Sequence, residues 1–210
     1  MDVFEAIRTR RSRRAFDSRP VEPDKINKIL DAACWAPSPS NSQPWEFVVI
    51  TNEASRNRLY DLSEIAREKG TVELHGYAYV RPTPIASVDE ESEEREKSFP
   101  DYAFTFLRKV PVIVAVVGLP QAQVRLRGAG RIQDGYKYAC AAAIQNMLLA
   151  AQALELGSLW FTFFDQKLVG QFLNIDPGKH IVALVCLGYP AGDARSPGRY
   201  PCESKVRRLD

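Results

Sequence analysis

Two polar segments near the start of the chain carry residue types that chemistry needs. The first, Arg10-Arg11-Ser12-Arg13-Arg14, follows a short helical pattern. Its guanidinium groups and its hydroxyl offer the charge, the forked donors and the fixed geometry that bind a phosphate. The second, residues 37–44, is rich in Pro, Ser, Asn and Gln and leads directly into an apolar strand. Its amide and hydroxyl groups can bind a polar heterocycle, so the two segments together predict a site for flavin mononucleotide (FMN).

The same residues resemble the nitroreductase family of FMN-dependent oxidoreductases. Looser matches follow in residues 139–153, 156–160 and 187–190 and at Arg199, and residues between 67 and 102 show no match. The specific part of the pattern lies in the N-terminal quarter of the chain and consists of Ile7, Arg10, Arg11, Ser12, Arg14, Phe16, Pro20, Val21, Ile29, Leu30, Ala32, Ala33, Trp35, Ala36, Pro37, Ser38, Asn41, Gln43, Pro44, Trp45 and Phe47.

The resemblance implies how the arginines would hold FMN. Arg10 and Ser12, together with Arg11, would bind the phosphate, and Arg199 would reach it from the end of the chain. Arg14 would lie near the pyrimidine edge of the ring, where a positive charge stabilises an anionic reduced flavin. Taken alone, the same cluster is also typical of a solvated basic patch or of an arm that binds anionic surfaces.

Two further segments complete the implied site. One is a loop that reaches the flavin across a dimer interface, although its composition is also typical of a turn whose side chains bind their own backbone. The other lies against the ring and offers a backbone N–H near N5; its alternative is an aromatic core strand. Relatives often have glycine where this chain has Phe163. The loop residues are Pro37, Ser38, Asn41 and Gln43, and the ring segment is Trp160, Phe161 and Thr162.

The resemblance also implies a reaction. NAD(P)H would reduce FMN, leave, and be replaced by a nitroaromatic, a quinone or a similar small acceptor, in a ping-pong cycle that depends on positioning and electrostatics. No side chain is expected as nucleophile, general acid or metal ligand, and His75 and His180 have no partners at metal-ligand spacing. The sequence names neither the physiological acceptor nor the preferred nucleotide.

Two alternative functions stay open. The first is a specialised flavin enzyme: a dehalogenase, an ene-reductase or a flavin-degrading enzyme. The second is a basic-arm protein that binds nucleic acid or other anions, for which binding would weaken steeply with salt. The net charge of +2 over 210 residues does not favour such a partner.

Composition indicates one soluble domain over residues 1–210, placed in the cytoplasm. The hydrophobic fraction is 45% and the charged fraction 26%, and no apolar run approaches a membrane span or a signal peptide. The four cysteines lack metal-site and CxxC spacing, and three lie in apolar stretches, so reduced and buried thiols are expected.

Hydrophobic periodicity and capping signals predict helices and strands over most of the chain. Asp2 is an expected N-cap, and Pro23 is expected at the first turn of the second helix. The apolar pattern of the strand at 45–51 is continuous rather than alternating, so both of its faces are expected to be covered. Helices are predicted at 2–10, from 23 to before 37, and at 53–69, 101–108, 132–156 and 165–173; strands at 45–51, 111–118, 158–163 and 181–187; and a loop at 119–130.

The fold implied by the resemblance is α+β, an intertwined homodimer with a mixed, mostly antiparallel sheet flanked by helices. Residues 139–151 are apolar nearly all round, which indicates a subunit interface or, alternatively, a central core helix. The Pro- and Gly-rich tail after 188 is expected to wrap over a neighbour. Residues 71–101, with an acidic run, are either an insertion that covers the site as a lid or a solvated segment.

Overall fold

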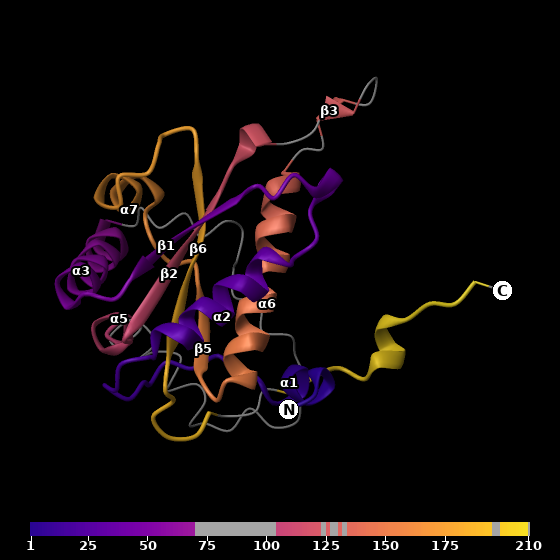
Figure 1. Ribbon diagram of the computed structural model, residues 1–210, viewed down its shortest axis with the longest axis horizontal. Coiled ribbons are helices and arrows are strands. Elements are labelled where there is room, and N and C mark those ends of the chain that lie inside the picture. Colours follow the sequence, from indigo (N-terminus) through magenta and orange to yellow (C-terminus); the bar gives the residue numbers. More distant parts are fainter. Residues whose placement is uncertain (70–103, 123–124, 127–129, 132–133, 195–197, 210) are drawn as a thin grey trace.

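The computed structural model describes residues 1–69, 104–122, 125–126, 130–131, 134–194 and 198–209. Its centre is a four-stranded antiparallel sheet in the order β1-β2-β6-β5. A separate two-stranded hairpin, β3 with β4, projects beyond the sheet (Figure 1). The strands are β1 (Trp45–Ile50), β2 (Val112–Gly118), β3 (Arg125–Leu126), β4 (Gly130–Arg131), β5 (Gly157–Phe161) and β6 (His180–Gly188).

Helices cover both faces of the sheet (Figure 1). One face packs against α2 and α6, and the other packs against α3, α5 and α7. The helices are α1 (Val3–Thr9), α2 (Pro23–Cys34), α3 (Glu53–Lys69), α5 (Phe106–Lys109), α6 (Gly135–Ala153) and α7 (Gln166–Phe172), with short 3-10 turns at Pro39–Asn41, Pro120–Ala122 and Cys202–Lys205.

Side-chain alternation along the central strand β2 builds two hydrophobic cores. The side chains of Val112, Val114 and Val116 face α2 and α6. Those between them, from Ile113 on, face α3. Every residue of β2 is buried, as the uninterrupted apolar run predicts. A bulge in β6 opposite Val116 shifts the register by one residue, and the Gln166 side chain bonds both backbone groups of Ile181 beside it.

Several predicted boundaries are confirmed. Asp2 caps α1, since its Oδ1 accepts a hydrogen bond of 2.9 Å from the backbone N–H of Glu5. Pro23 is the first residue of α2, and α3 has the predicted bounds. Asp165 caps α7 in the same way as Asp2 caps α1, through the N–H of Leu168. These ends could be predicted because capping depends on residues only a few positions apart.

Other predicted elements need correction. The strand β1 is an edge strand: Trp45 packs in one core and Ile50 in the other, as expected, but the cover is incomplete because Val49 is 39% exposed. The segment 119–130 is not all loop, because it contains a 3-10 turn and most of the β3–β4 hairpin. The strand predicted at 158–163 ends at Phe161, and α5 begins at Phe106. The proposed lid at 71–101 lies outside the described residues.

The long helix α6 is covered within one chain. Nine of its residues are buried, against α2, the sheet and, at its C-terminal end, α1. One chain leaves other apolar side chains exposed: Phe4 at 67%, Trp35 at 80% and, on α6 itself, Tyr138 at 71%. The burial of α6 thus fits the expected alternative, a central core helix, and the subunit interface stays a prediction.

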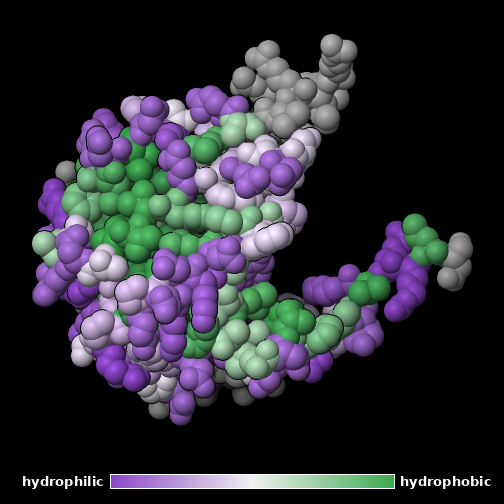
Figure 2. All heavy atoms as spheres, viewed as in Figure 1, coloured by the Kyte–Doolittle hydropathy of each residue, from purple (hydrophilic) through white to green (hydrophobic). Residues whose placement is uncertain are grey.

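The tail after the last strand extends away from the body, as expected. Figure 2 shows it standing clear of the globular part, with hydrophobic residues among hydrophilic ones. Tyr200, Val206 and Leu209 are all exposed, the last at 83%. An extended tail with exposed apolar side chains is typical of a segment that packs on another chain.

The strap of residues 15–21, which follows the arginine segment, is fixed to the end of β6. The backbone N–H of Asp17 donates to the carbonyl of Tyr189 over 2.8 Å. The Tyr189 hydroxyl donates to the Glu22 carboxylate, accepts from Lys25 Nζ at 2.8 Å, and its ring lies under the Arg19 guanidinium. A backbone hydrogen bond and the tyrosine hydroxyl lower the pKa of Glu22.

The cysteines fall into two classes rather than the expected one. All four are free thiols; Cys140 and Cys186 are buried, whereas Cys34 and Cys202 are exposed. Cys34 was expected to be buried because it follows an apolar stretch, but it ends α2 on the outer side of the helix. Burial raises the pKa of Cys140 to about 12 and that of Cys186 further.

A thiol titration checks this division. At pH 8, below both raised pKa values, Cys140 and Cys186 stay as unreactive thiols, because the thiolate is the reactive form. A disulfide reagent should therefore modify no more than Cys34 and Cys202 in the native protein, and all four thiols after denaturation. The double variant Cys34→Ser, Cys202→Ser keeps only Cys140 and Cys186. Rapid reaction of this variant with the reagent in its folded state would contradict the burial of these two thiols.

Candidate functional site

The arginine segment lies along the free edge of β5. Ser12 forms a single parallel bridge with Ser158, and the Arg13 N–H donates to the Ser158 carbonyl over 2.9 Å. The segment thus adds a very short strand at the edge opposite β6 and supplies the parallel component that was expected of the sheet. This bridge holds the backbone of the arginine segment, which connects α1 to the residues after it, next to β5 and its predicted ring segment.

Arg10 and Arg199 approach each other from opposite ends of the chain. Arg10 caps the C-terminal end of α1, where its N–H donates to the Ala6 carbonyl, and its side chain is half-buried. Burial lowers the pKa of Arg10, and the positive charges of Arg199 and Arg11 lower it further. The structure therefore brings two of the predicted phosphate ligands together, in a place where an added anion would relieve their repulsion.

Arg11 and Arg13 direct their side chains at the protein itself. Arg11 Nη1 donates to the carbonyls of Arg8 and Arg10, at 2.6 and 2.8 Å, and so completes the C-terminal end of α1. Arg13 Nη1 donates to the Gly192 carbonyl at 2.9 Å. These two arginines thus hold the backbone in place. The cluster is part of the fold, which argues against a free basic arm.

The ring segment divides between the two faces of β5. Trp160 is 36% exposed, whereas Phe161 is 4% exposed and packs edge-on against Phe104 and Phe106, each with ring centroids 5.4 Å away. Phe161 is therefore a core residue on the α3 side, and its side chain is not placed to contact a flavin. Thr162 lies beyond the strand end and is exposed.

The backbone hydrogen-bonding groups of β5 also point alternately to its free edge and to β6. The Ser158 carbonyl points at Arg13, away from β6, and backbone groups alternate along a strand. The N–H of Trp160 therefore points to the free edge of β5, whereas that of Phe161 points to β6. Within the predicted segment, Trp160 offers the backbone donor at the site and Phe161 does not.

The loop of residues 37–44 is a tight turn held by its own atoms. Ser40, Asn41 and Gln43 have φ values of 53°, 55° and 43°, in the left-handed region. Ser38 Oγ accepts a 2.9 Å hydrogen bond from the Gln43 N–H. The expected alternative, a side chain that binds its own backbone, is realised for Ser38. The side chains of Pro37, Asn41 and Gln43 are exposed.

The loop and the arginine segment lie at opposite ends of α6 in one chain. Cys140 Sγ donates to the Pro44 carbonyl near the start of α6, and Gln152 Nε2 donates to Thr9 Oγ1 near its end. With a rise of about 1.5 Å per residue, these two points on the helix are roughly 18 Å apart. Figure 1 shows this arrangement, with α1 at the lower end of α6 and the violet turn between α2 and β1 at the upper end.

Comparison with known proteins identifies the family. The sequence profile of the nitroreductase family matches residues 7–189. The chain belongs to the nitroreductase family. It is accordingly an oxidoreductase, as the pattern of the N-terminal residues predicted.

Individual relatives cover nearly all of the chain. An NADH dehydrogenase of Thermus thermophilus is 30% identical over 98% of this chain and 95% of its own length. A 5,6-dimethylbenzimidazole synthase of Rhodospirillum rubrum is 28% identical over 86% of this chain and 78% of its own. A Desulfovibrio desulfuricans protein, solved in complex with FMN, superposes with a TM-score of 0.67 and 25% identity over 100% of this chain and 98% of its own. The nitroreductase fold, with its predicted α+β class, is confirmed.

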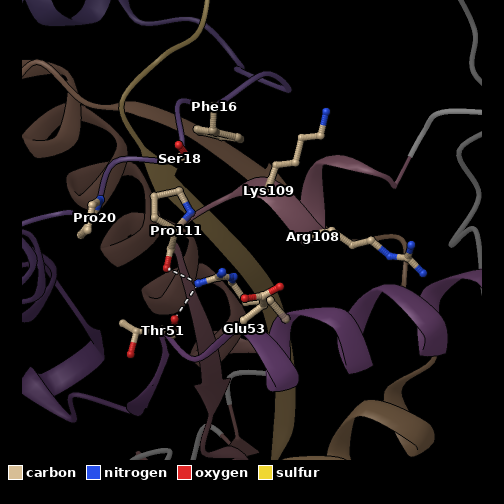
Figure 3. Close-up of a pocket in the computed structure, with 9 residues that line it drawn as sticks. Phe16, Ser18, Pro20, Thr51, Glu53, Arg108, Lys109 and Pro111 are labelled. Carbon is tan, nitrogen blue, oxygen red and sulfur yellow. Dashed lines mark hydrogen bonds between the residues drawn. The ribbon is translucent and has the colours of Figure 1, made fainter.

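This nitroreductase-family chain has a cavity of about 590 Å³ away from the predicted residues. It lies between the strap, the start of α3 and α5, as Figure 3 shows, and contains none of the implied FMN ligands. Arg56 at its wall donates to the carbonyls of Thr51 and Pro111, and Arg108 pairs with Asp61 at 3.3 Å. Its arginines therefore already bind the protein.

The described residues contain neither a metal-binding cluster nor a membrane-spanning helix. They contain no cluster of three or more His, Cys, Asp or Glu side chains that could hold a metal ion. No helix in the described ranges has the length and apolar character needed to cross a membrane. His180 Nδ1 lies 2.8 Å from the Tyr136 hydroxyl.

Proposed function

We propose that this chain is an FMN-dependent enzyme that transfers electrons from NAD(P)H to a nitroaromatic, a quinone or a similar small acceptor by a ping-pong mechanism. The observation that carries the proposal is the approach of Arg10 and Arg199 beside Ser12. A half-buried guanidinium beside a second, exposed one, two residues before a serine hydroxyl, fits a phosphate. A relative of the same fold, solved with FMN, supports the choice of cofactor.

The chain's own residues would bind and orient the cofactor. Arg10, Arg199 and Ser12 would hold the phosphate, and Arg14 would bring positive charge toward the ring. The backbone N–H of Trp160 at the free edge of β5 would donate to the ring. When bound, FMN would supply the redox chemistry, accepting a hydride from NAD(P)H and passing electrons to the acceptor.

We propose that the complete site needs two chains. The loop with Ser38, Asn41 and Gln43 lies roughly 18 Å from the arginine segment along α6, on the helical rise of about 1.5 Å per residue. A homodimer would bring the loop of one chain to the arginines of the other. The exposed apolar side chains of α1, Trp35 and the extended tail offer the surface for such a dimer.

A visible absorption spectrum tests the proposal. The purified protein, loaded with FMN if necessary, is mixed with NADH or NADPH without oxygen. Bleaching of the flavin bands is the expected result, and the nucleotide that bleaches faster is the preferred donor. A protein that binds no FMN would overturn the proposal. Sedimentation of the holoenzyme at the mass of a single chain would overturn the two-chain site.

A second candidate follows from the relative named 5,6-dimethylbenzimidazole synthase, at 28% identity. The isoalloxazine ring of FMN carries a dimethyl-substituted benzene ring, so such an activity here would consume flavin rather than recycle it. The reduced protein is given oxygen and excess FMN. Irreversible loss of flavin absorbance, together with 5,6-dimethylbenzimidazole in the mass spectrum, would favour this candidate over the electron-transfer cycle.

A further inference from the structure

A buried hydroxyl on β5 has no partner. Ser158 is 1% exposed, and its Oγ is buried and makes no hydrogen bond. Ser63, which is 0% exposed, is the other buried polar residue of the described part, and it donates to the Leu59 carbonyl at 2.9 Å. A buried hydroxyl without a partner has lost its hydrogen bonds to water and gained none in exchange.

Ser158 lies beside the predicted phosphate site. It is bridged directly to Ser12, and side chains of directly paired residues project from the same face of a sheet. Alternation along β5 places Trp160 on that face as well. Arg13 lies on the other face, since a Cβ on Gly157 would come within 2.9 Å of its Cγ. The two serines and the exposed tryptophan thus share one side of the β5 edge.

We propose that Ser158 is a further FMN-binding residue, whose hydroxyl donates to an oxygen of the cofactor next to Ser12. The inference rests on the proposed function, because it needs FMN at the arginine segment. Binding would give the buried hydroxyl the acceptor that the protein does not provide. Ser158 was not among the residues predicted from the sequence, since a serine inside an apolar strand is by itself typical of a packed core.

Replacement of the hydroxyl tests the inference. Ser158→Ala apoprotein is titrated with FMN, and its dissociation constant is measured by quenching of flavin fluorescence. A rise of at least fivefold over the native protein is expected, with no fall in the melting temperature of the apoprotein, because the lost hydroxyl bonded nothing. Ser63→Ala is the matched control: its melting temperature should fall and its FMN affinity should stay the same.

The same titration with riboflavin, which lacks the phosphate, identifies the oxygen. A loss of affinity confined to FMN assigns the hydroxyl to the phosphate, and a loss for both flavins assigns it to the ribityl chain; either supports the inference. Unchanged affinity for both flavins would overturn it and leave the proposed function intact. A native protein that binds neither flavin would overturn both. Should the alanine variant not fold, Ser158→Cys, a weaker donor of similar size, is measured in its place.

Discussion

Arg10→Ala is expected to weaken FMN binding roughly 30-fold. The change removes a charged hydrogen bond to the phosphate, which contributes about 2 kcal/mol, and about 1.4 kcal/mol corresponds to a factor of ten in affinity. Burial, together with the positive charges of Arg199 and Arg11, disfavours the charged form of Arg10 and lowers its pKa. A bound anion would stabilise that charge. The dissociation constant, from fluorescence quenching of FMN by the apoprotein, measures the effect.

The control separates a local contact from net charge. Arg58→Ala removes one positive charge from the exposed side of α3, away from the arginine segment. Its FMN affinity should match that of the native protein at 0.15 M salt, where exposed charges more than about 8 Å apart are screened. Equal FMN affinity for Arg10→Ala and the native protein would mean that the phosphate binds elsewhere.

Gly118→Ala is expected to destabilise the protein by about 2 kcal/mol, the cost of overpacking a tight core. A Cβ at Gly118 would lie 2.8 Å from Cε2 of Tyr136 and closer still to Cδ2. The tyrosine ring is 5% exposed, and its hydroxyl lies 2.8 Å from His180 Nδ1, so the ring cannot turn away freely. Thermal unfolding should show a melting temperature roughly 6 °C lower, since about 3 °C corresponds to 1 kcal/mol at this length.

A second glycine supplies the opposite expectation. Apart from the neighbouring residues and backbone of its own helix, nothing lies within 4 Å of a Cβ built on Gly170, inside α7. Gly170→Ala should therefore raise the free energy of unfolding by about 0.5–1 kcal/mol, because alanine loses less backbone entropy in a helix. If Gly118→Ala and Gly170→Ala shift the melting temperature in the same direction, the packing of Tyr136 on Gly118 does not explain the change measured for Gly118→Ala.

Local signals in the sequence determined much of the fold. Asp2 and Pro23 mark helix starts through interactions within one turn, and the apolar run of β2 predicts a strand covered on both faces. The family could be predicted because its pattern is concentrated in the N-terminal quarter of the chain.

The tertiary structure alone decided which residues of the predicted site lie together. Periodicity predicts that Trp160 and Phe161 lie on opposite faces of β5, but only the packing of α3 and α5 makes the Phe161 face the core. The approach of Arg199 to Arg10 joins residues that are far apart in the sequence. Such contacts depend on how whole elements pack, and no local pattern encodes them.

The bridge between Ser12 and Ser158 and the separation of the loop from the arginines have the same origin. Both follow from where α1 and the strap pack against β5 and α6, which no neighbouring residues specify. The sequence by itself thus determined the residue types, the helix and strand starts and the family. Long-range packing decided that Arg11 and Phe161 support the fold, that Ser158 pairs with Ser12 at the edge of β5, and that the predicted loop and the arginine segment lie at opposite ends of α6.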